Sequence, residues 1–238
     1  MTQSITGNAG PKVRSDIEVT LELTDSGGID LSLKSKVKSM YGHAIENQCR
    51  ELLEHFGIKN ARISVTDTGA LPFVIAARVE AAVKALGNTS SAFLPEMLPE
   101  NLYSSDRGRF RFSRLYLPGN NPGMFLNAGL HSPDGVILDL EDSVAPARKD
   151  EARILLRNAL RAVNFYGAER MVRINQGERG LEDLEYLIPH NVNLVLVPKC
   201  EAPDTLVAIE RKISSIRKDN KNPRAVHLMP IIESALGV

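Results

Sequence analysis

The chain has 238 residues, of which 43% are hydrophobic, and its 29 basic residues are balanced by 29 acidic ones. This length allows one large hydrophobic core or two modest ones, and the composition excludes collagen-like and low-complexity chains. The balanced charge argues against nucleic acid or anionic lipid as a partner, and no apolar run is long enough to span a bilayer.

The N-terminal residues and the cysteines bear on the compartment. Residues 1–16, MTQSITGNAGPKVRSD, lack the apolar core of a secretory signal. Cys49 and Cys200 lie far apart and make no C-x-x-C motif. We therefore expect a protein of the reducing cytoplasm. Cys49 falls on the apolar face of a predicted helix, which favours a place in the core.

The first part of the chain predicts a small α+β domain over residues 1–86. Residues 17–23, IEVTLEL, and 29–33, IDLSL, alternate apolar and polar residues around a DSGG turn, which predicts a hairpin. Apolar residues three and four apart from Tyr41 onward predict a helix that ends at Gly57. A strand, ARISVT, and an alanine-rich helix, FVIAARVEAAVKAL, complete the domain.

The second part of the chain has a different pattern. Residues 87–111 contain small polar residues and prolines without a sustained period, and we interpret them as a linker. Over residues 112–238, short apolar strands alternate with stretches long enough for helices, which predicts a parallel sheet covered on its faces. The predicted strands are RLYLPG, GVILDLED, RMVRIN, NLVLVPK and VHLMPIIE.

Polar residues follow these strands at their carboxyl ends, the face of a (β/α) barrel where chemistry takes place. They are Glu141, Asp142, Arg173, Asn175, Lys199 and Glu233. Glu233 with a second carboxylate would suit Mg²⁺, and the guanidinium of Arg173 would suit a substrate carboxylate or an oxyanion. Glu141 and Asp142 could orient Arg173 or accept a proton. Together these groups suit breakage or formation of a carbon–carbon bond through an enolate.

Structural interpretations of the same residues stay open. Asp142 and Ser143 could cap the following helix, and Arg173 could make a structural ion pair. The five histidines are scattered without ligand spacing, which favours structural or solvated positions. The chain contains no G-x-G-x-x-G, G-K-[ST] or H-E-x-x-H motif, so common nucleotide and zinc sites have no support.

Several motifs resemble the citrate lyase beta subunit and its aldolase relatives, which include malyl-CoA lyase. Over residues 112–238 these motifs are LYLPGNNPGM, GVILDLEDSVAPARKDEAR, RMVRIN, LVLVPK and IIESALGV. Residues 9–86 resemble the citrate lyase acyl carrier protein, the gamma subunit, through AGPKVRSDIEVTLEL, GIDLSLKSKV, YGHAIE and GALPFVIAARVEAAVKAL. The resemblance implies an α/β fold, in which an α+β acyl-carrier domain precedes a partial (β/α)8 TIM barrel with about five of the eight strands.

The resemblance also implies roles for individual residues. Glu233 of the I-E-S motif would bind Mg²⁺ at the substrate site, and Arg173 of V-R-I-N would bind the oxaloacetate moiety. Glu141 of L-E-D would be an acidic catalytic residue near the pocket. The carrier domain would be a phosphoprotein that holds 2'-(5''-triphosphoribosyl)-3'-dephospho-CoA on a serine in an S-G-D or S-S-D motif. The chain instead reads Arg14, Ser15, Asp16, so Arg14 occupies the usual serine position and Ser15 is the candidate for attachment.

The implied function is a citrate lyase component that carries an acyl thioester and cleaves citryl thioester to oxaloacetate and acetyl thioester with Mg²⁺. A malyl-CoA or citramalyl-CoA lyase acting on free CoA esters is one alternative, and a carrier or assembly subunit without catalysis is another. The expected partners are the citrate lyase alpha subunit, which is the transferase, and the other lyase subunits, in an oligomer.

The end of the chain leads to a further expectation. In the family the second Mg²⁺ ligand is an aspartate on the strand after Glu233, and the chain ends before that strand. We therefore expect a fragment or a chain that needs a complement, with negligible lyase turnover by itself. Missing strands would also leave apolar side chains of the inner barrel face exposed.

Overall fold

The structure is a computed structural model that describes residues 2–87, 89–221 and 224–238. It consists of two compact units, Met1–Pro95 and Glu96–Val238. The boundary between them falls within the predicted linker, residues 87–111. Among the described residues, no helix combines the length and the apolar character needed to cross a membrane.

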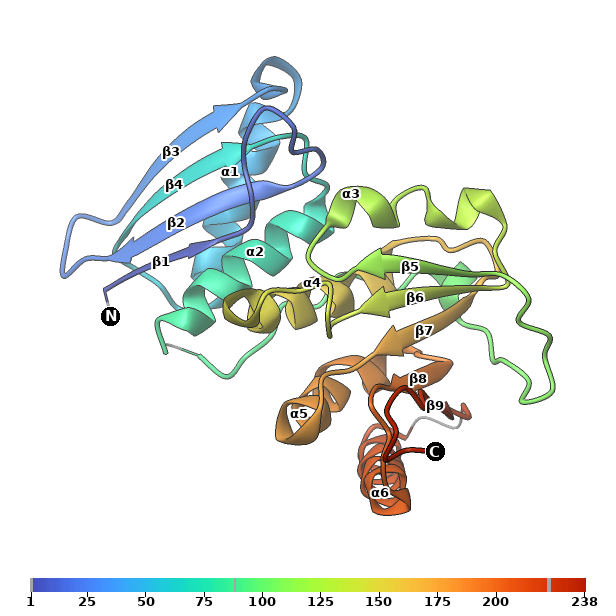
Figure 1. The fold of residues 1–238 in the computed structure, drawn as a ribbon. Helices are drawn as coiled ribbons and strands as arrows, with labels where there is room; N and C mark the ends of the chain where they lie inside the picture. Colours follow the sequence, from blue (N-terminus) through green and yellow to red (C-terminus); the bar gives the residue numbers. More distant parts are fainter. Residues whose placement is uncertain (1, 88, 222–223) are drawn as a thin grey trace. The chain divides into compact units, whose positions relative to one another are not determined.

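The first unit is a four-stranded sheet with two helices (Figure 1). Its elements are β1 (Gln3–Thr6), β2 (Ile17–Leu23), β3 (Ile29–Ser35), α1 (Lys38–His55), β4 (Ala61–Asp67) and α2 (Pro72–Ala85). The strand order is β1-β2-β4-β3, in which only β3 and β4 are parallel. The predicted strands and helices are present, but the short β1 was not predicted.

The predicted hairpin of β2 and β3 is wrong, because β4 lies between these strands. The connection explains the pairing of β3 with β4. Helix α1 connects β3 to β4, and a helical crossover joins strands that run parallel. The burial follows from the order: the central strand β4 buries Ala61, Ile63 and Val65 almost completely, whereas the corresponding side of the edge strand β3 is only partly buried.

The predicted apolar face of α1 is buried in the core, with one exception. Ile45, Cys49 and Leu52 are buried, but Tyr41 in the first turn is 56% exposed. Burial, together with the charge of Asp67, raises the pKa of the Cys49 thiol to about 12. Cys49 is thus an inert core residue, as its position on the helix predicted.

The second unit is an α/β structure built on a five-stranded parallel sheet. The order of its strands follows the sequence, β5-β6-β7-β8-β9. The strands are β5 (Arg114–Pro118), β6 (Gly135–Asp139), β7 (Glu169–Arg173), β8 (Leu194–Val197) and β9 (His227–Pro230). The helices are α3 (Pro122–Phe125), α4 (Lys149–Ala162), α5 (Gly177–Leu187) and α6 (Pro203–Asp219), with short 3-10 turns at Pro99–Asn101, Ala128–His131, Pro146–Arg148 and Ile188–His190.

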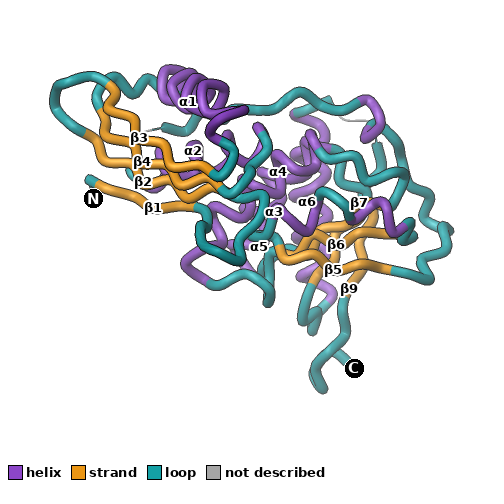
Figure 2. The backbone as a smooth tube through the Cα atoms, turned by 90° about the horizontal axis from the view of Figure 1, so that it is seen from above, coloured by secondary structure: helices purple, strands orange, loops and turns teal. Residues whose placement is uncertain are grey.

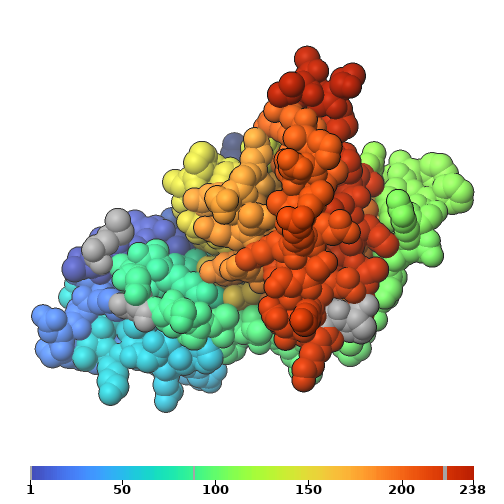
Figure 3. Space-filling model, turned by 90° about the horizontal axis from the view of Figure 1, so that it is seen from below, coloured from blue at the N-terminus to red at the C-terminus, as the bar shows by residue number. Residues whose placement is uncertain are grey.

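Helices alternate with the strands of this sheet, as predicted, but they cover one face and not both. In Figure 2, α4, α5 and α6 lie beside the strands of the second unit. Figure 3 shows α6 along the surface, and its buried residues are confined to one stripe, Ile209, Ile213 and Ile216. Helix α4 is far more deeply buried, because every residue from Glu151 to Leu160 is buried.

The other face of the sheet holds an apolar cluster made of Ile137, Met171, Leu194 and Leu196. All four side chains are at most 2% exposed, so the expectation of an exposed inner face is wrong for them. The expectation of exposure is correct for Tyr116 on the edge strand β5, because this side chain is 49% exposed.

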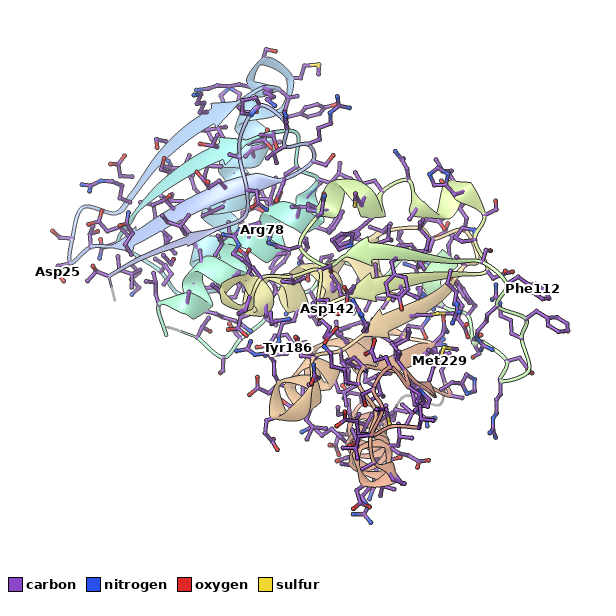
Figure 4. All side chains as sticks on the ribbon, in the orientation of Figure 1. Asp25, Arg78, Phe112, Asp142, Tyr186 and Met229 are labelled. Atoms are coloured by element: carbon purple, nitrogen blue, oxygen red, sulfur yellow. The ribbon has the colours of Figure 1, made fainter. Side chains whose placement is uncertain are left out.

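The burial of this face has a geometric cause. The sheet curls so strongly that Nη1 of Arg114 on β5 lies 3.4 Å from Sδ of Met229 on β9, although these are the two edge strands. Met229 also packs against the apolar cluster. Figure 4 labels Met229, which belongs to β9 of the second unit.

The segment Leu98–Arg111, which we call the strap, packs on the second unit although it lies in the predicted linker. The amide of Asn101 is fully buried and donates to the carbonyl oxygens of Leu160 and Val163 at 3.1 and 2.8 Å. Arg111 donates to the carboxylate of Glu169, which is completely buried. The strap is therefore part of the fold of the second unit.

His190 makes the second unit sensitive to mild acid. Burial and the charges of Arg161 and Arg157 lower its pKa from 6.5 to about 3, and its Nδ1 lies 3.1 Å from Nη1 of Arg161. The folded state keeps the ring neutral while the unfolded state protonates it, so stability is full above pH 6.5 and falls as the pH drops below it. Over the 1.5 units from pH 6.5 to 5 the loss is about 2 kcal/mol.

We expect His190→Gln to remove most of this loss. The measurement is urea unfolding of the parent and the variant at pH 7 and pH 5, followed by fluorescence or circular dichroism. An equal drop in unfolding free energy in both proteins would show that His190 is not the group responsible.

Candidate functional site

The centre of the candidate site is an ion pair between two strand ends. Asp139 ends β6 and Arg173 ends β7, and the parallel register places them directly opposite each other. Nε and Nη2 of Arg173 each donate to one oxygen of Asp139 at 2.7 Å. The backbone N–H groups of Glu141 and Ser143 also donate to Asp139. This bidentate geometry fixes the plane of the guanidinium.

The ion pair holds both partners in their charged forms. Burial alone would raise the pKa of Asp139, but hydrogen bonds from Arg173, Ser143 and the backbone lower it below its usual value. The hydrogen bond to Asp139 raises the pKa of Arg173 further. Arg173 also lies over the ring of Tyr116, with Cζ 5.3 Å from the centroid. A permanent, oriented positive charge therefore stands at the carboxyl ends of the strands.

Glu141 connects this pair to Lys199. Oε1 of Glu141 accepts from Nζ of Lys199 at 2.6 Å and from Nε2 of Gln176 at 2.9 Å. Its Oε2 lies 3.3 Å from Nη1 of Arg173. Burial would raise the pKa of Glu141, but the hydrogen bonds and the charge of Arg173 outweigh it, and the pKa is lowered. Glu141 is thus an ionised acceptor in a mainly buried position.

Asp142 lies on the rim of the site. Its side chain is 63% exposed and stands 3.5 Å from both Nη1 of Arg173 and Nζ of Lys199. Figure 4 labels it beyond the strand ends of the second unit. The N-cap position of α4, directly before Lys149, is occupied by Arg148, and no side chain caps the helix. Neither Asp142 nor Ser143 therefore caps α4.

Lys199 also contacts Glu233. Its backbone N–H donates to Oε1 of Glu233 at 2.9 Å, and its φ of 45° lies in the left-handed region. Lys199 therefore hydrogen-bonds two carboxylates, that of Glu141 through its side chain and that of Glu233 through its backbone, in addition to its ion pair with Asp142. The sequence placed Lys199 at a strand end but gave no sign of either contact.

No cluster of metal-binding side chains surrounds Glu233 among the described residues. Within these parts of the chain, no group of three or more His, Cys, Asp or Glu side chains could hold a metal ion. The carboxylate of Glu141 is already bound by Lys199, Gln176 and Arg173, and that of Glu233 is exposed.

A cavity of about 350 Å³ lies next to these residues, between the starts of α5 and α6. Its polar lining includes Asn175, Gln176, Lys199 and Thr205. Lys199 therefore borders both the charged cluster and the cavity.

The candidate attachment residue belongs to the first unit. Ser15 lies in the loop between β1 and β2, with a left-handed φ of 58°, and is partly exposed. Arg14 before it is exposed, whereas Asp16 after it is buried. The sequence-predicted site residues thus fall into two groups: Ser15 in one unit, and Glu141, Arg173 and Glu233 in the other.

Comparisons with known proteins find different relatives for the two units. Residues 113–238 match the family model described as HpcH/HpaI aldolase/citrate lyase, and residues 5–86 match the model described as malonate decarboxylase delta subunit (MdcD). Citrate lyase subunit beta of Leuconostoc mesenteroides subsp. cremoris is 36% identical over 137 residues, which cover 55% of this chain and 44% of that protein. The chain therefore spans less than half of the length of that beta subunit.

Two further similarities concern one unit each. The citrate lyase acyl carrier protein of Escherichia fergusonii is 44% identical over 75 residues, which cover 32% of this chain and 77% of that protein. A solved structure with a similar second unit is a crystal structure of protein CitE from Mycobacterium tuberculosis in complex with magnesium and acetate. The two sequences are 32% identical, and the match covers 52% of this chain and 45% of that chain, with a TM-score of 0.40.

Proposed function

Because this chain belongs to the HpcH/HpaI aldolase/citrate lyase family, and its first unit belongs with the citrate lyase acyl carrier proteins, we propose that it is a combined carrier and lyase component of citrate lyase. The observation that carries this proposal is the presence, on one chain, of units similar to two subunits of the same enzyme. A lyase acting on free CoA esters would have no need for the carrier unit.

The proposed reaction is cleavage of a carrier-bound citryl thioester. A base removes the proton of the tertiary hydroxyl group, the carbon–carbon bond breaks, and its electron pair moves to the acetyl thioester as an enolate. That enolate is then protonated, and oxaloacetate is released. The oriented charge of Arg173 supports a role in binding the oxaloacetate moiety, because a guanidinium fixed by Asp139 loses little freedom when it binds a carboxylate.

Glu141 and Glu233 have separate roles in the proposal. Glu141 is ionised and hydrogen-bonded to Lys199, which supports a role as an acidic group that orients the two cations. Its lowered pKa makes it a weak base, so this observation does not favour a role in accepting a proton. Glu233 is proposed as one contributor to a Mg²⁺ and substrate site. The identity of the base is left open.

In its carrier role, the first unit would hold the prosthetic group on Ser15. We propose that 2'-(5''-triphosphoribosyl)-3'-dephospho-CoA is attached there, on the loop before β2, and carries the acetyl or citryl thioester. The partners proposed for the whole protein are the alpha subunit and the other lyase subunits, as an oligomer in the cytoplasm, with citrate and oxaloacetate as the small molecules.

The test combines mass and activity. The chain is co-expressed with a transferase for the prosthetic group, and intact mass is measured for the parent and for Ser15→Ala. Oxaloacetate release from carrier-bound citryl thioester and from free citryl-CoA and citramalyl-CoA is then measured, with the alpha and beta subunits added and omitted.

Each outcome of this test has a distinct meaning. A mass increase that Ser15→Ala abolishes, with oxaloacetate formed only from the carrier-bound ester, supports the proposal. An unmodified protein that cleaves free CoA esters would instead indicate a malyl-CoA or citramalyl-CoA lyase. A modified protein whose turnover with an added beta subunit is unchanged by Arg173→Met would be a carrier or assembly subunit.

A further inference from the structure

The loop that carries Ser15 is anchored by a buried ion pair. Nε and Nη2 of Arg78, on α2, donate to the two carboxylate oxygens of Asp16, each at 3.0 Å. The side chains of Arg78 and Asp16 are 0% and 2% exposed. Figure 4 labels Arg78 on the helix beneath this loop of the first unit. The residue directly after Ser15 is thus joined to a helix more than sixty positions away in sequence.

Asp16 uses its remaining hydrogen-bonding capacity on the loop itself. Its carboxylate also accepts from the amide of Asn8 and from the backbone N–H of Ile17, both at 2.9 Å. Its carbonyl oxygen accepts from both the N–H and the hydroxyl group of Thr68. Asp16 therefore connects the start of the loop, its end, the turn after β4 and helix α2.

Two further contacts fix the chain on either side. The N–H of Ser15 donates to the carbonyl oxygen of Thr68 at 3.2 Å. A Cβ atom on Gly7 would lie 1.8 Å from the carbonyl oxygen of Ile17, so the two ends of the loop approach each other as closely as glycine allows. Ser15 thus stands in one backbone conformation, with φ of 58°, between fixed neighbours.

A buried bidentate ion pair contributes little net free energy to the stability of a fold. The desolvation of two charges offsets most of their attraction, and a pair of uncharged residues of similar size often stabilises a fold equally well. What the charged pair provides is a single geometry, because the fork of arginine matches a carboxylate in one plane. Here that geometry determines the position of the residue next to Asp16.

We propose that Arg78 is a positioning residue for group attachment: through Asp16 it holds Ser15 in the conformation that the attaching enzyme recognises. This inference rests on the proposed function, in which Ser15 is the attachment residue. Arg78 does not touch the incoming group, and its effect is exerted through the loop.

The test compares three variants of the full chain. Arg78→Met removes the donor, Asp16→Asn/Arg78→Met leaves an uncharged pair in which the amide oxygen can still accept from Ile17, and Arg62→Met is the matched control. Arg62 makes a surface ion pair with Glu22 at 2.9 Å, and its side chain is 63% exposed. For each protein we measure unfolding free energy, amide hydrogen exchange of residues 8–17 and the rate of prosthetic-group attachment by intact mass.

We expect attachment to slow at least tenfold in both Arg78 variants and to be unchanged in Arg62→Met. The double variant is decisive, because we expect it to regain stability relative to Arg78→Met without regaining the attachment rate. Faster amide exchange over residues 8–17 should accompany the slow attachment. A double variant that is labelled at the parental rate would overturn the inference and leave Arg78 with a structural role only.

Failure of the proposed function has a different signature. If the parent itself is not labelled, Ser15 is not the attachment residue, and Arg78 has no attachment to assist. The exchange data then show whether Arg78 orders the loop: unchanged exchange in Arg78→Met would overturn that part of the inference as well.

Discussion

Arg173→Met is expected to lower the unfolding free energy of the second unit by about 3–5 kcal/mol, the usual cost of leaving a buried carboxylate without its partner. Asp139 is 2% exposed and receives two donors from Arg173. Its pKa, now lowered, should rise in the variant. Any lyase turnover supported by the parent should be lost together with the binding of the oxaloacetate moiety.

The measurement is urea unfolding at pH 7, with Arg179→Met as the control. Arg179 pairs with Asp150, and the two side chains are 41% and 73% exposed; such a solvent-accessible pair contributes at most about 1 kcal/mol. Asp139→Asn in the Arg173→Met background should recover part of the stability, because the charge that lacks a partner is removed. A loss no larger than that of Arg179→Met would contradict the assignment of Arg173 as the partner of a buried charge.

Arg111→Met is expected to have an effect of similar size, about 3–5 kcal/mol, although Arg111 lies outside the segment that matches the lyase family. Its guanidinium donates to both carboxylate oxygens of Glu169, a fully buried residue of β7. It also donates to the backbone oxygens of Asp106, Arg107 and Arg109, so the strap folds around this one side chain.

The control is Arg107→Met, a change at an exposed position of the same strap. We expect it to change the unfolding free energy by less than about 0.5 kcal/mol, as is usual for surface substitutions. Arg111→Met/Glu169→Gln should be more stable than Arg111→Met, because no charge then remains buried alone. If Arg111→Met unfolds at the same urea concentration as Arg107→Met, Arg111 does not anchor the strap.

The elements that could be predicted from sequence are those whose pattern is local. The alternation in residues 17–23 and 61–67 and the apolar runs of the second unit identify strands because each strand buries its own residues. The pairing of strands is not local. Nothing in residues 17–33 shows that β4 will separate β2 from β3, since that order depends on a strand made thirty residues later.

In the candidate site, too, the residues that could be predicted are those marked by a local pattern. Residues that come directly after parallel strands meet at one edge of the sheet, so Glu141 and Arg173 were predictable as neighbours. Asp139 was missed because the predicted strand GVILDLED extends to Glu141 and Asp142, whereas β6 ends at Asp139. The registry of β6 and β7 places it opposite Arg173, and that registry could have identified it.

The strap escaped prediction because its anchors are single polar residues in an aperiodic segment. Asn101 and Arg111 make their contacts with residues about sixty positions away, and no periodicity marks such a contact. The polar composition that suggests a linker here reflects hydrogen bonds to the backbone and to a buried carboxylate. Composition alone therefore does not distinguish a tether from an anchored segment.

The strand orders of the two sheets imply that their strands can pair at different stages of synthesis. In the second unit every strand pairs with the one before it, so the sheet can grow from β5 to β9 as each strand leaves the ribosome. In the first unit β2 and β3 must both wait for β4, which fills the place between them. Until residue 67 has emerged, both strands have an open edge available to other chains, and we expect this interval to be the one in which a nascent chain needs a chaperone.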